Sequence, residues 1–168
     1  FVTRKITRAT AKIALGLDNC LYLGNLNSQR DWGHAKDYIE GMYLILQQDK
    51  AEDFVLATGI TTTIRDFVIM SFAELGIELG FRGTNEAEQG YVVKNTGVYN
   101  LEVGKVVIKV DPKYYRPTEV DLLIGDPTKA MTKLGWNPKY NLASLVKEMV
   151  ASDMTLFKKE LFVKESGI

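Results

Sequence analysis

Three basic side chains, one acidic side chain and one tyrosine stand where they could bind an anionic ligand. Arg30 follows a glycine turn and a short polar run and directly precedes a helical pattern, so we predict that it sits on a short, anchored segment. A guanidinium matches two phosphate oxygens and keeps its charge at neutral pH. The alternative is that Arg30 pairs with Asp31 or covers a helix end, because surface arginine-acid pairs are common.

The other candidates are distant from Arg30 in the sequence. Lys5 lies in the first turn of a predicted helix, where a cation gains nothing from the helix dipole, so a bound anion would explain it; the alternative is a solvated lysine. Arg116 precedes a proline, which keeps its backbone extended. Glu119 can accept hydrogen bonds, and Tyr22 offers a flat apolar surface. Together these residues fit a diphosphate with a hydroxyl-bearing sugar better than a simple carboxylate.

The chain lacks the patterns of several reactive sites. Glu86 stands where a dinucleotide-binding loop would need a third glycine after Gly80 and Gly83. There is no tyrosine followed four positions later by lysine, no nucleophile elbow and no P-loop. Cys20 and His34 are the only cysteine and histidine, so we expect neither an internal disulfide nor a zinc site. The residues therefore indicate a binding set rather than a reacting set.

Composition narrows the class of protein further. The 168 residues are enough for one domain, and 21 basic residues balance 21 acidic ones. This balance argues against a broad nucleic-acid surface or a polybasic membrane contact. No apolar run approaches the roughly 18 to 20 residues that span a bilayer, and no signal peptide is recognisable. We therefore expect a cytoplasmic protein without nucleic-acid or membrane partners.

The first half of the chain carries the patterns of two helices and two strands. An amphipathic helix is predicted from Arg4 to Leu17 and a strand at residues 21–23. The apolar spacing after residue 34 predicts a core-facing helix that runs to Gln48. Residues 53–57 form a short apolar run that predicts a buried strand.

A third helix is predicted next. Thr63 is predicted to cap this helix, and Gly76 to end it. Residues 77–110 alternate strand-forming runs with glycine-bearing loops, which favours hairpins. A short helix is predicted to begin at the Asp126-Pro127 pair and to end at Gly135, before a long last helix.

Four segments carry a resemblance to a known family: FVTRKITRA, LYLGN followed by RDWGHAKDY, YYRPTEVD, and GDPTKAMTKLGW. They closely resemble the carboxy-terminal half of the GDP-mannose 4,6-dehydratases, which are extended short-chain dehydrogenases/reductases. The resemblance runs from Phe1 to about residue 155. It implies an α/β fold with helices and short strands, in which residues 1–168 are one nucleotide-sugar-binding domain and the complete Rossmann domain is absent. Because the chain begins without a methionine, we expect it to start within a longer protein.

The resemblance also implies roles for individual residues. It assigns Arg30 and Arg116 to the diphosphate and Glu119 to the ribose hydroxyls. It places four more residues near the nucleotide, mostly on its guanine-ribose side: Lys5, Tyr22, Leu23 and Gly24. It assigns no catalytic, cofactor-binding or metal residue to this chain, because the family's catalytic threonine, glutamate, tyrosine and lysine and its NADP-binding glycines belong to the other half.

The implied activity belongs to the whole enzyme, which converts GDP-mannose to GDP-4-keto-6-deoxymannose on the route to GDP-fucose and other deoxyhexoses. Hydride moves from C4 of mannose to NADP, water is lost across C5 and C6, and hydride returns at C6. This chain alone is expected to be inactive, and the resemblance implies a homo-oligomer, a dimer or tetramer. Two alternatives stay open: the same domain of another nucleotide-sugar epimerase or reductase, and a free-standing nucleotide-binding module. Against the module stands the first helix, whose apolar stripe we expect to need a partner domain.

Overall fold

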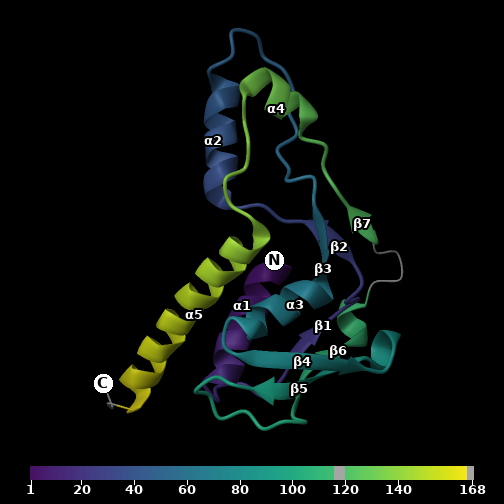
Figure 1. Ribbon diagram of the computed structural model, residues 1–168, viewed down its shortest axis with the longest axis vertical. Coiled ribbons are helices and arrows are strands. Elements are labelled where there is room, and N and C mark those ends of the chain that lie inside the picture. Colours follow the sequence, from purple (N-terminus) through teal and green to yellow (C-terminus); the bar gives the residue numbers. More distant parts are fainter. Residues whose placement is uncertain (116–119, 166–168) are drawn as a thin grey trace.

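The computed structural model describes residues 1–115 and 120–165, so Arg116 and Glu119 lie outside the described residues. The described residues form an α/β fold with one four-stranded and one three-stranded sheet (Figure 1). The α/β fold that the family resemblance implied is therefore confirmed.

Three helices enclose the main hydrophobic core. Helix α1 (Val2–Ala14) packs against α5 (Leu142–Glu165) and α3 (Ile64–Ala73). The largest buried side chains here are aromatic or branched: Ile6, Ile13, Phe67, Phe72 and Phe157. The expectation that the apolar stripe of α1 needs a partner domain was wrong, because α3 and α5 of the same chain cover it.

The four-stranded sheet contributes buried side chains to the same core. Its strands are β1 (Leu21–Leu23), β6 (Val106–Val110), β5 (Gln89–Asn95) and β4 (Ile77–Arg82), in that spatial order. Strand β1 runs parallel to β6, whereas β6, β5 and β4 are antiparallel neighbours. The predicted strand at 21–23 and the predicted hairpins in 77–110 are confirmed.

The three-stranded sheet carries Arg30. Strand β2 (Gln29–Asp31) lies between β3 (Thr61–Thr63), which is antiparallel to it, and β7 (Leu122–Leu123), which is parallel. Both sheets thus contain one parallel pair, β1 with β6 and β2 with β7. A short 3-10 helix, η2 (Pro112–Tyr114), follows β6, and another, η1 (Asn85–Ala87), precedes β5.

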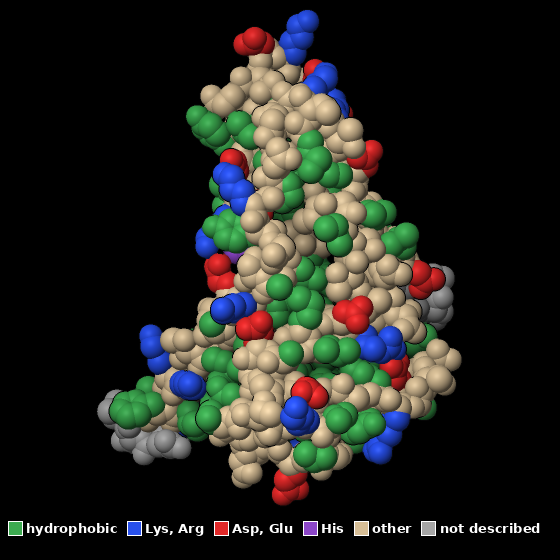
Figure 2. Space-filling view, viewed as in Figure 1, with side chains coloured by type: hydrophobic (Ala, Val, Ile, Leu, Met, Phe, Trp, Pro, Cys, Tyr) green, Lys and Arg blue, Asp and Glu red, His purple; other side chains and the backbone are tan. Residues whose placement is uncertain are grey.

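Helix α2 (Ala35–Leu46) forms where a helix was predicted but does not face the core. Ile39 is 65% exposed, Met42 57% and Leu46 81%. The helix is held from its other side, where Gly41 lies against Trp136, beside α4 (Thr128–Leu134). Its apolar stripe therefore points outward, and Figure 2 shows hydrophobic side chains on the surface of this upper part of the molecule.

Residues 53–57 were predicted to be a buried strand, and this was also wrong. They run next to α4 without pairing to any strand among the described residues. Val55 is 52% exposed, although Ala57 is buried. The apolar run and the stripe of α2 are thus left uncovered in the same part of the molecule.

The predicted helix ends are mostly confirmed. The hydroxyl oxygen of Thr63 accepts from the backbone N–H of Asp66 at 3.0 Å and caps α3. Asp126 accepts from the N–H of Thr128 at 2.9 Å, but α4 begins one residue later than predicted. Gly135 ends α4 with a φ of 65°, the left-handed conformation that favours glycine.

Candidate substrate-binding site

Arg30 is fixed by its strand and by backbone carbonyl groups. It pairs with Thr62 of β3 and with Leu123 of β7, so its main chain sits in the middle of the small sheet. Its Nη1 donates to the carbonyl oxygens of Gln29 and Val120, each at 2.8 Å. The prediction of a short, anchored segment is confirmed, although the segment is a strand and not a loop. The contact with Val120 ties Arg30 to the end of the segment that contains residues 116–119.

Asp31 and Trp32 hold the backbone next to Arg30. The carboxylate of Asp31 accepts from the N–H and the hydroxyl of Thr58, at 3.0 and 2.6 Å, and from the N–H of Gly59 at 2.8 Å. Trp32 packs edge-on against Phe67 of α3, with ring centroids 4.9 Å apart. These contacts join β2 to the loop before β3 and to the core, so the position of Arg30 is determined on both sides.

Lys5 and Tyr22 meet in a second group of residues. They line an open cavity of about 300 Å³, together with Arg8, Cys20 and Tyr114. The Nζ of Lys5 lies 3.6 Å from the centroid of the Tyr114 ring, a distance typical of a cation–π contact. Partial burial lowers the pKa of Lys5, and the nearby carboxylate of Asp111 opposes this change. A cation that is partly desolvated and faces a cavity interacts more strongly with an anion than a fully solvated one does.

Gly24 lies under this cavity in direct contact with the chain that follows β6. A side-chain carbon at Gly24 would come within 2.1 Å of the carbonyl oxygen of Tyr114. Leu23 is only 2% exposed, so its side chain belongs to the core. Its carbonyl oxygen accepts from the N–H of Asp111 at 2.8 Å. The end of β1 and the start of η2 are therefore joined backbone to backbone.

The structure thus brings Lys5, Tyr22 and Gly24 together and places Arg30 on the neighbouring sheet. Arg30 lines a different concavity, of about 330 Å³, together with Trp32 and Leu123. The chain between the two groups is the segment from Tyr115 to Val120. Arg116 and Glu119 are in that segment, outside the described residues, so their assignments stay predictions. The sequence did not indicate Tyr114; the only available signal was its place directly before the Tyr115-Arg116-Pro117 run.

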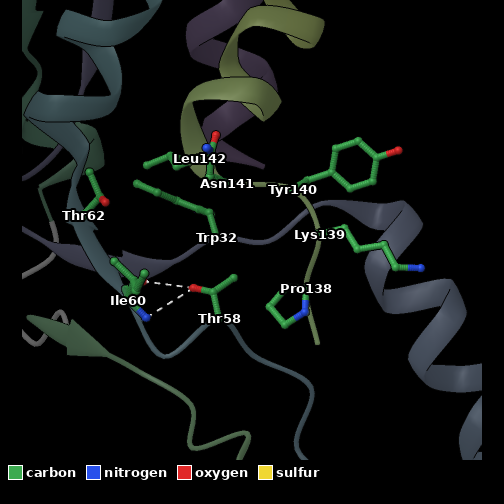
Figure 3. Close-up of a pocket in the computed structure, with 9 residues that line it drawn as sticks. All are labelled: Trp32, Thr58, Ile60, Thr62, Pro138, Lys139, Tyr140, Asn141 and Leu142. Carbon is green, nitrogen blue, oxygen red and sulfur yellow. Dashed lines mark hydrogen bonds between the residues drawn. The ribbon is translucent and has the colours of Figure 1, made fainter. Parts of the chain in front are cut away.

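A third cavity lies on the other side of Trp32 (Figure 3). Its volume is about 220 Å³, and its walls come from Trp32, the loop before β3 and the segment that enters α5. In that loop, Thr58 and Ile60 are joined by two hydrogen bonds, of 3.2 and 3.3 Å. None of the five predicted binding residues that the structure describes lines it, so we keep it apart from the candidate site.

His34 caps the start of α2. Its Nδ1 accepts from the N–H of Lys36 at 3.1 Å, which caps the helix. Its Nε2 lies 3.2 Å from a carboxylate oxygen of Glu148 in α5, and its ring stacks on Tyr140. Hydrogen bonds from Lys36 and His34 lower the pKa of Glu148. His34 therefore joins two helices.

Comparison with known proteins decides the family. A family model described as GDP-mannose 4,6 dehydratase matches residues 1–149. The chain belongs to this family. A GDP-mannose 4,6-dehydratase of Yersinia enterocolitica is 50% identical over 99% of this chain, and the human one is 52% identical over 94%. These alignments cover 45% and 40% of the two relatives, so the chain spans less than half the length of the curated dehydratases that it matches.

Solved structures extend the likeness to the fold. RMD from Pseudomonas aeruginosa, complexed with NADPH, matches 92% of this chain with a TM-score of 0.69 and 16% identity. UDP-glucose 4-epimerase from Bifidobacterium longum, in complex with NAD+ and UDP, matches 90% with a TM-score of 0.60 and 15% identity. The matched parts are 43% and 39% of those chains. The prediction of part of an extended short-chain dehydrogenase/reductase fold is thus confirmed.

Proposed function

We propose that this chain is the GDP-sugar-binding portion of an NADP-dependent GDP-mannose 4,6-dehydratase. In this proposal Arg30 and Arg116 hold the diphosphate and Glu119 holds the ribose hydroxyls. The cavity of Lys5 and Tyr22 takes the guanosine side. Family membership supports the substrate class, and the partly buried cation of Lys5 beside Tyr114 supports an anionic ligand at this place. Binding energy from the nucleotide then orients the sugar for residues outside this chain.

The observation that carries the proposal is where the described residues on either side of 116–119 lie. These residues are Tyr115, directly after the residue that contacts Gly24 and Lys5, and Val120, whose carbonyl oxygen accepts from Arg30. Arg116 and Glu119 are therefore adjacent in sequence to described residues that neighbour one group or the other. A diphosphate bound between the two groups would have cations available from either side.

We further propose that a separate NADP-binding part supplies the catalytic groups. Helix α2 and residues 53–57 leave apolar side chains uncovered, among them Ile39, Met42 and Val55. Exposed patches of this kind are typical of surfaces that contact another protein part. This argues against a free-standing module and is consistent with relatives more than twice as long. No helix among the described residues is long and apolar enough to cross a membrane, and we propose a cytoplasmic homo-oligomer, a dimer or tetramer.

Calorimetry with GDP and GDP-mannose tests the proposed site. Replacing Arg30 or Arg116 with alanine is expected to weaken binding by about 1.5 to 3 kcal/mol, the range for hydrogen bonds to charged groups. Arg82→Ala is the control, because Arg82 lies on β4, donates to Gln89 and stacks on Tyr91. Unchanged affinities in both site variants would reject the diphosphate assignment.

Two further measurements separate the alternatives. Tighter binding of UDP-glucose than of GDP-mannose would favour the alternative of another nucleotide-sugar epimerase or reductase. The 168-residue chain with NADP supplied is expected to show no dehydratase activity. Turnover of GDP-mannose by this chain alone would overturn the proposal that a separate part supplies the catalytic groups.

A further inference from the structure

The guanidinium of Arg65, in the first turn of α3, contacts two segments at once. Its Nε and Nη2 donate to the same carboxylate oxygen of Glu88, at 3.0 and 2.5 Å. Its Nη1 donates to the side-chain oxygen of Asn27 at 2.7 Å. The side chain of Glu88 is 7% exposed and that of Arg65 26%. Both partners of this arginine-carboxylate contact are thus largely buried, and the proposed function does not use it.

Asn27 belongs to the connection between β1 and β2, the strand that contains Arg30. The start of α3 also holds the main chain of this connection, because the N–H of Arg65 donates to Leu26 O and that of Ile64 to Ser28 O, both at 3.0 Å. Side-chain and main-chain bonds from one helix turn therefore fix the segment just before Arg30.

Glu88 directly precedes β5 of the other sheet and lies beside the other arm of the proposed site. Its carbonyl oxygen accepts from the N–H of Val110, the last residue of β6, at 3.3 Å. The next residue, Asp111, donates to Leu23 O and leads into η2, where Tyr114 contacts Gly24. The Arg65–Glu88 pair thus links the segment before Arg30 to the end of β6, across the two sheets.

We propose that Arg65 and Glu88 are positioning residues that set the separation between the two arms of the GDP-sugar site. One arm is Arg30, and the other is η2, whose Tyr114 lies against Gly24 and Lys5. This inference rests on the proposed function. A buried ion pair is weak evidence for stability, because desolvation offsets most of the attraction between the charges. Its fixed, multiply bonded geometry suits it to holding two elements at one distance.

GDP and GMP together test this role. GDP reaches both arms, whereas GMP lacks the second phosphate and depends less on their separation. In the natural protein that carries this sequence, Glu88→Gln is expected to weaken GDP binding about tenfold, comparable with the loss of one charge-assisted hydrogen bond. GMP binding should weaken by less than about threefold. Glu78→Gln is the matched control, because Glu78 forms an exposed pair with Lys94 between β4 and β5 at 3.3 Å.

A double-variant cycle shows whether Glu88 acts through Arg30. If it does, combining Glu88→Gln with Arg30→Ala should weaken GDP binding by less than the product of the two separate effects. Arg65→Lys keeps the charge but loses the forked geometry, so it should give an intermediate loss of GDP affinity. Asn27→Ala leaves the ion pair intact. If Glu88→Gln does not fold, GDP and GMP binding are measured with Asn27→Ala instead. It too should weaken GDP more than GMP.

The outcomes of the two proposals are distinguishable. Unchanged GDP affinity in Arg30→Ala would reject the proposed function. If Arg30→Ala weakens GDP binding but Glu88→Gln and Asn27→Ala leave it unchanged, only the positioning role is rejected. Equal losses for GDP and GMP, accompanied by a lower melting temperature, would show a purely structural pair and would also reject that role.

Discussion

Gly24 and Tyr114 approach so closely that a Cβ added to Gly24 would lie 2.1 Å from the carbonyl oxygen of Tyr114. Real Cβ atoms do not come this near to a backbone oxygen, so only glycine allows the end of β1 to meet η2. The contact also places Tyr114 next to Lys5. The shape of the proposed guanosine side therefore depends on a residue without a side chain.

Gly24→Ala should separate these two segments. We expect the free energy of unfolding to fall by about 1 to 3 kcal/mol, as for other overpacked sites. The affinity for GDP should fall about tenfold, because displacement of η2 moves Tyr114 and the start of the segment that carries Arg116. Urea unfolding and calorimetry measure the two effects separately.

Gly104→Ala is the control for loss of stability alone. Gly104 has a φ of 89° with open space around its Cβ position, so alanine is strained there without striking a neighbour. It should cost about 1 kcal/mol of stability and leave GDP affinity unchanged. If Gly24→Ala behaves in the same way, the contact between Gly24 and Tyr114 has no part in binding.

Cys20 offers a chemical probe of the same cavity. Burial raises the pKa of its thiol, an effect that Asp18 reinforces and Lys109 opposes. Since the thiolate is the reactive form, alkylation at pH 7.5 should be slower than for a free cysteine. The rate should rise with pH and level off only above pH 9. Because Cys20 lines the cavity with Lys5 and Tyr22, saturating GDP should slow the reaction further.

Mass spectrometry of the iodoacetamide adduct follows this rate, and Cys20→Ser gives the background. An alkylation rate that is the same with and without GDP would contradict the placement of the guanosine side in this cavity. Guanosine alone should protect less than GDP, because it lacks the phosphates that Arg30 is proposed to hold.

The exposed face of α2 gives a third prediction. In the 168-residue chain, Met42→Gln with Leu46→Gln should change stability by no more than about 0.5 kcal/mol, because both side chains are already in water. Binding of an apolar dye should decrease. Where the same chain is joined to the proposed NADP-binding part, the double substitution should lower the free energy of unfolding by about 2 kcal/mol or more, because buried apolar area is lost.

Val98→Gln is the comparison, because Val98 is 93% exposed and lies in the turn between β5 and β6, far from α2 in the fold. It should leave the free energy of unfolding unchanged in both forms of the protein. Equal, small effects of the α2 substitutions in both forms would mean that this face is not covered by the other part.

The sequence predicted well those features that neighbouring residues decide. The hairpins of residues 77–110, the cap at Thr63 and the helix end at Gly135 follow from turn and capping chemistry within a few residues. The apolar spacing of α2 predicted the helix but not its surroundings. An apolar stripe indicates which face of a helix avoids water but not which element covers it. The prediction of a buried strand at residues 53–57 was wrong for the same reason.

The candidate site was only partly predictable for a similar reason. Arg30 stood out by its type and by the turn before it, but its place in a strand depends on Thr62 and Leu123, which are remote in sequence. No pattern links Arg65 to Glu88, because their contact arises only when the start of α3 meets the residue before β5 in the folded chain. Of the seven predicted binding residues, Arg116 and Glu119 lie outside the described part of the chain.

The chain crosses from the larger sheet to the smaller one twice, and in the same direction. It passes from β1 to β2 and later from β6 to β7, and each sheet pairs the corresponding strands in parallel. Insertion of a residue into the β1–β2 connection would shift β2 relative to β7. The position of β7 in turn depends on the connection that follows β6. The lengths of the two crossings are therefore coupled, and length variation should instead collect in hairpin turns such as residues 97–104.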